Sequence, residues 1–96
     1  MKIICTKTFK AKDGKTFKVG KTYECEVQGY EYPTGVVGSY KVYPEDYYSS
    51  IPAKDFEKNF AKELWNGAGY PVNVIRKVKL NKMEEVKENF DKETNV

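Results

Sequence analysis

Apolar and polar residues alternate strictly in the stretch Tyr23-Glu24-Cys25-Glu26-Val27-Gln28, with the apolar side chains at odd positions. This period of two is typical of a β-strand that buries one face. Upstream, Ile3, Cys5, Phe17 and Val19 have the same odd parity. A later run, from Val36 to Val42, alternates on even positions. The first 43 residues therefore indicate several short antiparallel strands around one buried face.

The turn between Phe9 and Phe17 sets how the first two strands pair. A three-residue loop over Lys12-Asp13-Gly14, with Gly14 in the left-handed conformation, places Phe9 opposite Phe17. A two-residue loop over Asp13-Gly14 would put the two rings on opposite faces, because directly opposed residues share a face. We predict the three-residue loop, or a longer lobe that ends at Gly20.

Later segments show helical as well as extended patterns. Phe56, Phe60 and Leu64 recur every four residues after Pro52, which predicts one central helix that ends around residues 65–69. Residues 72–80 have the apolar spacing of a strand interrupted at position 76. Asn81, with an acidic residue three positions later, resembles a capping box and predicts a final helix.

A chain of 96 residues has room for one domain with one core. The patterns predict an α+β fold: a small, mainly antiparallel β-barrel or sheet with one central helix and a C-terminal strand and helix. We divide it into a barrel-like core over residues 1–64, a closing strand and helix over 65–90, and a frayed tail over 91–96.

Part of the chain also resembles a known group of proteins. The segments Phe17-Lys18-Val19-Gly20-Lys21-Thr22-Tyr23-Glu24 and Ile51-Pro52-Ala53-Lys54-Asp55-Phe56-Glu57-Lys58-Asn59-Phe60, together with Phe9, are similar to small Src-homology-3-like barrel proteins of phages and mobile elements of low-GC bacteria. The resemblance covers about the first 60 residues and involves strand and turn chemistry. It implies an Src-homology-3-like barrel and a phage accessory protein in the host cytoplasm, and it brings no catalytic residues.

The composition argues against an enzyme. The chain has no His, which removes the commonest general base and the commonest metal ligand. Its two cysteines, Cys5 and Cys25, lack the spacing of a zinc or disulfide-exchange motif, so we expect buried, reduced thiols. We therefore expect no catalytic residue, no metal and no cofactor. With no signal-peptide pattern and no membrane segment, we expect a cytoplasmic protein without a membrane partner.

Charge is segregated along the chain, although the formal net charge is only +3. Residues 1–22 carry +6, residues 23–64 carry −4, residues 65–82 carry +4 and residues 83–96 carry −3. If the first strand lay near residues 72–80, their cations would form one basic patch suited to phosphate. The alternative is an ordinary solvated face. The candidate nucleic-acid-binding residues are Lys7, Lys10, Lys12, Lys15, Arg76, Lys77 and Lys79.

Tyrosines supply the second candidate surface, since eight of the fourteen aromatic residues are Tyr. Tyrosine is enriched at binding hot spots, and neighbouring carboxylates disfavour phosphate, so a host or phage protein is the favoured partner. The alternatives are nucleic acid, self-association into an assembly, and rings that merely cover a small core. The candidate protein-binding residues are Tyr30, Tyr32, Tyr43, Glu45, Asp46, Tyr47 and Tyr48.

Overall fold

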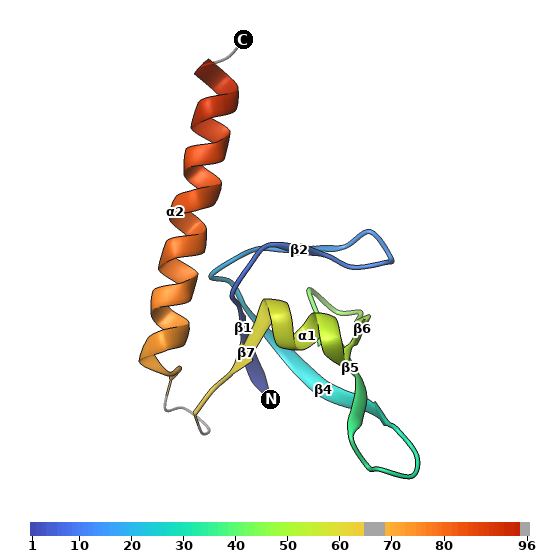
Figure 1. Ribbon diagram of the computed structural model, residues 1–96. Coiled ribbons are helices and arrows are strands. Elements are labelled where there is room, and N and C mark those ends of the chain that lie inside the picture. The colour runs from blue at the N-terminus through green and yellow to red at the C-terminus, as the bar shows by residue number, and fades with distance from the viewer. Residues whose placement is uncertain (65–68, 95–96) are drawn as a thin grey trace.

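Five antiparallel strands form the main sheet, in the spatial order β6-β5-β4-β1-β7 (Figure 1). The computed structural model describes residues 1–64 and 69–94. The sheet consists of β1 (Lys2–Cys5), β4 (Thr22–Tyr30), β5 (Val37–Tyr43), β6 (Ser49–Pro52) and β7 (Phe60–Lys62). A separate hairpin pairs β2 (Phe9–Lys10) with β3 (Thr16–Phe17), and the helices are α1 (Ala53–Asn59) and α2 (Val72–Thr94).

The predicted α+β class with a mainly antiparallel sheet is confirmed, but the sheet is open. Strands β6 and β7 are its two edges, and within the described residues they do not pair with each other to close a barrel. Of the two architectures that the sequence left open, the structure therefore has the sheet.

The predicted alternation along β4 is confirmed by burial on one face of the sheet. Tyr23 and Cys25 are buried, and Cys25 lies opposite the buried Val42 on β5. Ile3 on β1 lies opposite Tyr23 and has no exposed surface. The register of β4 with both of its neighbours thus places apolar side chains on the same face, which is the core face.

The β2–β3 hairpin has the predicted register. Phe9 lies opposite Phe17, and the amide of Gly14 donates to the carbonyl of Ala11, which closes the turn. Gly14 has a φ of 90°, in the left-handed region that glycine adopts without steric cost. The hairpin thus brings Phe17, which is fully buried, into the core.

Aromatic rings fill the space between the sheet, the hairpin and α1. Phe56 of α1 stacks on Tyr40 of β5 with 3.9 Å between ring centroids. Phe60 lies 5.4 Å from Phe56 and 5.5 Å from Phe17. Each large ring therefore joins two or three elements, as expected in a domain too small for a thick core.

The central helix is shorter than the sequence pattern predicts. It ends at Asn59, and Phe60 adopts an extended conformation at the start of β7. Phe60 pairs with Cys5 of β1 and keeps its ring buried against Phe17 and Phe56. Leu64, in contrast, is 52% exposed. The spacing of four correctly placed Phe56 and Phe60 in the same core. The chain after Asn59 nevertheless becomes a strand, because it pairs with the edge of β1. Most of the predicted helix end, residues 65–68, lies outside the described residues.

The predicted strand over residues 72–80 is wrong, because this segment is the first part of α2. The amide of Ile75 donates to the carbonyl of Pro71, which starts the helix. Val78 is buried, and Val74, four residues earlier on the same helical face, is half-buried. Asn81 is consequently inside the helix and is not its N-cap. Its side-chain amide donates to the carbonyl of Thr6, 75 residues away in the chain.

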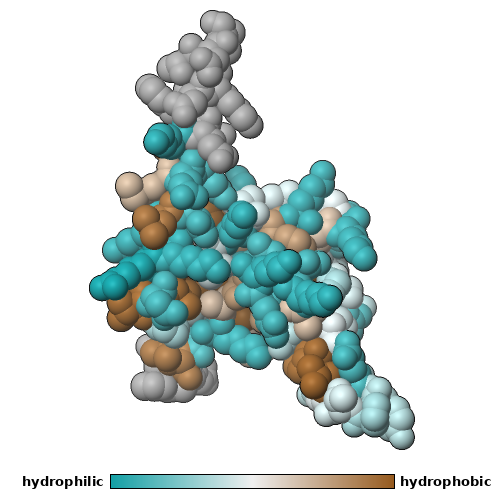
Figure 2. Space-filling view, in the orientation of Figure 1, coloured by the Kyte–Doolittle hydropathy of each residue, from teal (hydrophilic) through white to brown (hydrophobic). Residues whose placement is uncertain are grey.

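Helix α2 lies along one side of the molecule, and its C-terminal half extends beyond the sheet (Figure 1). Its helical backbone continues to Thr94, through part of the segment expected to be frayed; residues 95–96 lie outside the described residues. Brown and tan side chains remain on the surface over α2 among the teal ones (Figure 2).

Candidate binding surface

The loop between β5 and β6, residues 44–48, begins next to a tyrosine that is held in place. Tyr43 ends β5, and its hydroxyl donates a hydrogen bond to the Glu26 carboxylate on β4. This bond raises the pKa of the Tyr43 phenol, because the carboxylate favours the protonated hydroxyl. The ring is therefore fixed on the outer face of the sheet, opposite to the core.

Tyr48 packs against this ring. The centroids of Tyr43 and Tyr48 are 5.9 Å apart, with an edge-to-face angle of 64°. The ammonium nitrogen of Lys41 lies 4.8 Å from the centroid of Tyr48 and adds a cation–π contact. Tyr48 nevertheless keeps 44% of its surface exposed, so the ring is supported on one side and open on the other.

Tyr47 turns toward the β2–β3 hairpin. The ammonium nitrogen of Lys15 lies 4.7 Å from the centroid of its ring. The pKa of Lys15 is raised, first by a side-chain hydrogen bond with Tyr47. The hairpin turn, far from this loop in sequence, therefore contributes directly to the surface.

A second contact anchors the same turn. The hydroxyl of Ser49 donates to the Asp13 carboxylate over 2.8 Å, and Ser49 has no exposed surface. The amide of Lys15 donates to the other Asp13 oxygen over 3.0 Å. These two bonds lower the pKa of Asp13, because both stabilise its ionised form. Asp13 thus ties the hairpin turn to the first residue of β6.

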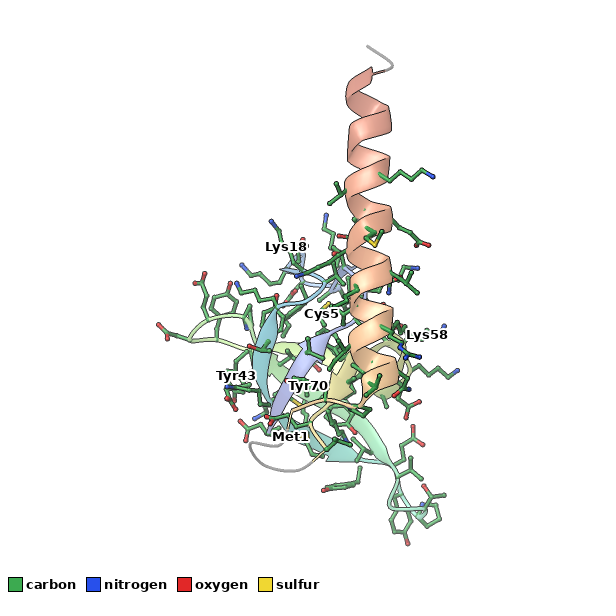
Figure 3. All side chains as sticks on the ribbon, turned by 90° about the vertical axis from the view of Figure 1, so that its left-hand side faces the viewer. Met1, Cys5, Lys18, Tyr43, Lys58 and Tyr70 are labelled. Atoms are coloured by element: carbon green, nitrogen blue, oxygen red, sulfur yellow. The ribbon has the colours of Figure 1, made fainter. Side chains whose placement is uncertain are left out.

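Between the turn and the edge strand β6 the surface is hollowed into an open groove. The groove is lined by Lys12, Asp13, Gly38, Ser39, Tyr48, Ser50 and Pro52. The three tyrosine rings and the lysines around them form one surface beside this groove. We call it the tyrosine–lysine surface and define it by Lys12, Lys15, Lys41, Tyr43, Tyr47 and Tyr48. Figure 3 shows Tyr43 beside the sheet and clear of α2.

Cations and carboxylates are mixed on the tyrosine–lysine surface. Its three lysines are accompanied by Asp13, Glu26, and the loop residues Glu45 and Asp46. The side chains of Glu45 and Asp46 are exposed. The surface is therefore close to neutral and does not form a continuous field of one sign.

The predicted tyrosine set is divided between the two ends of the β4–β5 pair. Tyr43 lies opposite Glu24, whereas Tyr30 lies opposite Val37. Six residues of strand separate these two positions on β4, which is about 20 Å at roughly 3.3 Å per residue. Tyr30 and Tyr32 are 67% and 96% exposed at the far hairpin tip. The structure packs Tyr43 against Tyr48, places Tyr47 of the same loop beside the hairpin turn, and leaves Tyr30 and Tyr32 apart from them.

The predicted basic set is also divided. Lys12 and Lys15 join the tyrosines, whereas Lys7 lines a small pocket beside the acidic residues Glu84 and Glu85 of α2. Lys10 is exposed on β2.

The remaining three cations of this set are exposed on α2. Helical geometry points Arg76, Lys77 and Lys79 in three different directions, because successive residues turn by about 100°. The single basic patch was predicted on the assumption that residues 72–80 form a strand beside the first strand. These residues are helical, so that patch does not form.

Sequence reasoning missed Lys41 and Glu26 as parts of the surface. The two residues lie opposite each other across β4 and β5. The alternation already predicts that both side chains face outward, because Glu26 is at an even position of β4 and Lys41 at an odd position of β5. Knowing that these two strands pair would have placed both residues beside the tyrosines. The contact of Asp13 with Ser49 spans 36 residues and had no such signal.

Both thiols are buried away from this surface. Burial raises the pKa of Cys5 to about 12 and that of Cys25 to about 11. Across residues 1–64 and 69–94, no group of three His, Cys, Asp or Glu side chains is placed to hold a metal ion. In the same part of the chain, no helix combines the length and the apolar character needed to cross a membrane.

Comparisons of this chain with family models, curated proteins and solved structures found no match.

Proposed function

We propose that this chain is a non-enzymatic accessory protein that binds another protein through the tyrosine–lysine surface. The observation that carries the proposal is that each of the three rings contacts a charged side chain of a strand or of the hairpin turn. Glu26 holds Tyr43, Lys41 lies over Tyr48, and Lys15 lies over Tyr47.

Fixed tyrosines are suited to recognition. A Tyr side chain offers a large amphipathic contact area and has only two rotatable side-chain torsions. When its position is set before binding, less conformational entropy is lost on association. Tyr47 and Tyr48 keep 43% and 44% of their surfaces exposed, so each ring retains area for a partner.

The mixed charge favours a protein over nucleic acid. Carboxylates at Glu26, Glu45 and Asp46 lie among or next to the rings, and each would repel a phosphate backbone. Protein interfaces tolerate both signs, with charged groups on a polar rim around an aromatic centre.

The biological setting of the proposal rests on the resemblance of residues 1–60 to phage and mobile-element proteins. It implies action in the cytoplasm of a bacterial host, where binding would inhibit a host component. Inhibition is the step that depends on this resemblance alone, whereas binding through the surface rests on its geometry.

Affinity capture with matched variants tests the proposal. The protein is immobilised as the wild type, as Tyr43→Ala/Tyr47→Ala/Tyr48→Ala, and as Tyr30→Ala/Tyr32→Ala, and each is exposed to lysate of a low-GC bacterium. Circular dichroism checks that all three are folded. We expect a protein retained by the wild type and by the Tyr30/Tyr32 control to be lost from the triple variant. Equal retention by the triple variant would refute the surface.

One observation favours nucleic acid as a second candidate. Lys12, Lys15 and Lys41 adjoin the tyrosine rings, and bases stack on such rings while lysines contact phosphate. Retardation of single- or double-stranded DNA or RNA at about 50 mM salt, falling steeply toward 200 mM, would support this alternative. Absence of retardation at about 50 mM salt removes it.

A further inference from the structure

Helix α2 has exposed apolar side chains on the side that is turned away from the sheet. Leu80, Met83 and Val86 are 61%, 68% and 68% exposed. Successive helical residues turn by about 100°, so Leu80 and Val86 lie within about 60° of Met83. The buried Val78, in contrast, is about 140° from Met83. Nothing in the described structure covers this apolar strip.

The charged side chains described on the same side of α2, within about 80° of Met83, are all cations. Arg76, Lys79 and Lys87 are exposed and lie within about 40° of Met83. Lys82, at about 100°, lines a shallow hollow together with Met83 and Lys87. An anionic group that approached the apolar strip would therefore meet positive charge on both sides of Met83.

The acids of α2 lie off this side or beyond it along the helix. Glu84 is about 100° from Met83 and lines the small pocket on that flank, together with the half-buried Glu85. The other three acids of the helix come after residue 87. We therefore define a basic apolar face within residues 72–87, formed by Arg76, Lys79, Leu80, Met83, Val86 and Lys87.

The turn between β3 and β4 adds cations beside this face. The Lys82 stem lies across Gly20 so closely that a Cβ at Gly20 would collide with it. Lys18 and Lys21, in the same turn, are exposed. Figure 3 looks onto the outer side of α2 and shows Lys18 to one side of the helix. The helix lies at the edge of the molecule (Figure 1), so a flat surface can reach this face without meeting the sheet.

We propose that the basic apolar face docks on an anionic lipid surface, with α2 lying in the plane of the membrane. Its cations would contact lipid phosphates, while Leu80, Met83 and Val86 enter the boundary between headgroups and acyl chains. The expectation of no membrane partner rested on the lack of a membrane segment, and a helix that lies on the surface needs none. The proposal does not depend on a protein partner at the tyrosine–lysine surface.

Charge and the order of the side chains favour lipid over other partners. Cations and apolar side chains are interspersed on the face and do not form separate strips. A fluid lipid surface presents phosphates and acyl chains at every point, so it accommodates this order. A protein would need carboxylates and apolar groups fixed in matching positions. A nucleic-acid backbone has no apolar counterpart for Leu80, Met83 and Val86.

Co-sedimentation with lipid vesicles tests the docking. The full chain is mixed with vesicles of phosphatidylcholine that contain about one-third phosphatidylglycerol, and with vesicles of phosphatidylcholine alone, at about 50 mM salt. We expect the wild type to sediment with the anionic vesicles only. The bound fraction should fall as the salt concentration rises, because salt screens the attraction between the cations and the phosphates.

Two pairs of lysine substitutions locate the contact. Lys79→Gln/Lys87→Gln is expected to bind the anionic vesicles about 25-fold more weakly, at about fivefold for each cation removed. Lys54→Gln/Lys58→Gln is the matched control, because it removes two exposed lysines from α1, and it should bind as the wild type does. Circular dichroism checks that both variants are folded.

A third variant tests the apolar part of the face. Met83→Gln/Val86→Gln leaves the net charge unchanged and alters two exposed side chains, so the fold should be retained. We expect it to bind the anionic vesicles more weakly than the wild type, because these side chains no longer enter the apolar boundary.

Three results would overturn the proposal. Anionic vesicles left unbound at about 50 mM salt would exclude lipid and leave an acidic protein as the occupant of the face. Equal binding by Lys79→Gln/Lys87→Gln and by its α1 control would place the contact elsewhere on the chain. Unchanged binding by Met83→Gln/Val86→Gln would show that the apolar strip does not enter the membrane.

Discussion

The ammonium nitrogen of Lys15 lies 4.7 Å from the centroid of the Tyr47 ring, which joins the turn of the β2–β3 hairpin to the loop between β5 and β6. A hydrogen bond between Ser49 and Asp13 connects the same two parts of the chain. Asp13 lies two residues before Lys15, and Ser49 lies two residues after Tyr47. The hairpin turn and the tyrosine loop are therefore one structural unit, and a change on one side should alter the other.

The Asp13 carboxyl should report this connection. We expect its pKa to lie below the ordinary value of about 3.9, and Ser49→Ala to raise it by removing one of the two stabilising bonds. Because the folded-state pKa is lowered, the carboxylate contributes stability that is fully present above the unfolded-state value and is lost as the pH falls through the folded-state value. An NMR titration measures the pKa of Asp13 in the wild type and in Ser49→Ala. Ser50→Ala is the control, and an unchanged pKa in Ser49→Ala would contradict the expected result.

The two thiols should be unreactive in the native protein. Cys5 and Cys25 are buried, and burial raises their pKa values to about 12 and about 11. At about pH 8 the reactive thiolate is therefore scarce as well as inaccessible. We expect a thiol reagent to modify neither cysteine until denaturant is added, after which both react. Rapid modification of the native chain at the same pH would show that the core is open.

Phe17 should be among the most sensitive positions for stability. It has no exposed surface and lies 5.0 Å from Tyr23 and 5.5 Å from Phe60, measured between ring centroids. We expect Phe17→Ala to lower the free energy of unfolding by about 3–5 kcal/mol, a large part of the total for a small domain. Urea denaturation measures the change. Tyr32→Ala, at a side chain that is 96% exposed, is expected to change it by less than about 0.5 kcal/mol.

A substitution at Asn81 distinguishes the observed helix, which starts at Val72, from the predicted one, which would start at Asn81. Its side-chain amide donates to the Thr6 carbonyl, so Asn81→Asp removes the donor and places a carboxylate oxygen against that carbonyl. We expect this change to lower the free energy of unfolding by about 1–3 kcal/mol. At an N-cap the same change would be nearly neutral, since Asn and Asp cap equally well. Asn73→Asp, an exposed change in the first turn of α2, is the control and should be neutral or slightly stabilising.

The inward face of β4 and the register of the β2–β3 hairpin could be predicted because their signals are local. The alternation from Tyr23 onward determines which side chains of β4 face inward, and the loop at Gly14 determines that Phe9 lies opposite Phe17. The segment after Pro71 could not be assigned in this way. Val74 and Val78 satisfy a helical spacing of four as well as a strand spacing of two, and the contact of Asn81 with Thr6 that accompanies the helical solution is invisible in a local window.

The candidate surface could be predicted only in part, for the same reason. Tyr47 and Tyr48 are neighbours in the chain, so their proximity was evident. The position of Lys15 over Tyr47 depends on how the hairpin folds over the edge of the sheet. Charge counting along the chain therefore grouped Lys15 with Arg76, although the first contacts the tyrosine loop and the second lies on α2.

Site-specific photo-cross-linking tests the central claim most directly, because it covalently labels whichever protein touches the chosen position. A photoreactive phenylalanine analogue replaces Tyr48 in one variant and Tyr32 in another, and each protein is irradiated in lysate of a low-GC bacterium and analysed by mass spectrometry. We expect a discrete adduct with one protein at position 48 and none at position 32, since only the first lies on the tyrosine–lysine surface. No adduct at position 48, or the same adduct at both positions, would contradict the assignment of that surface.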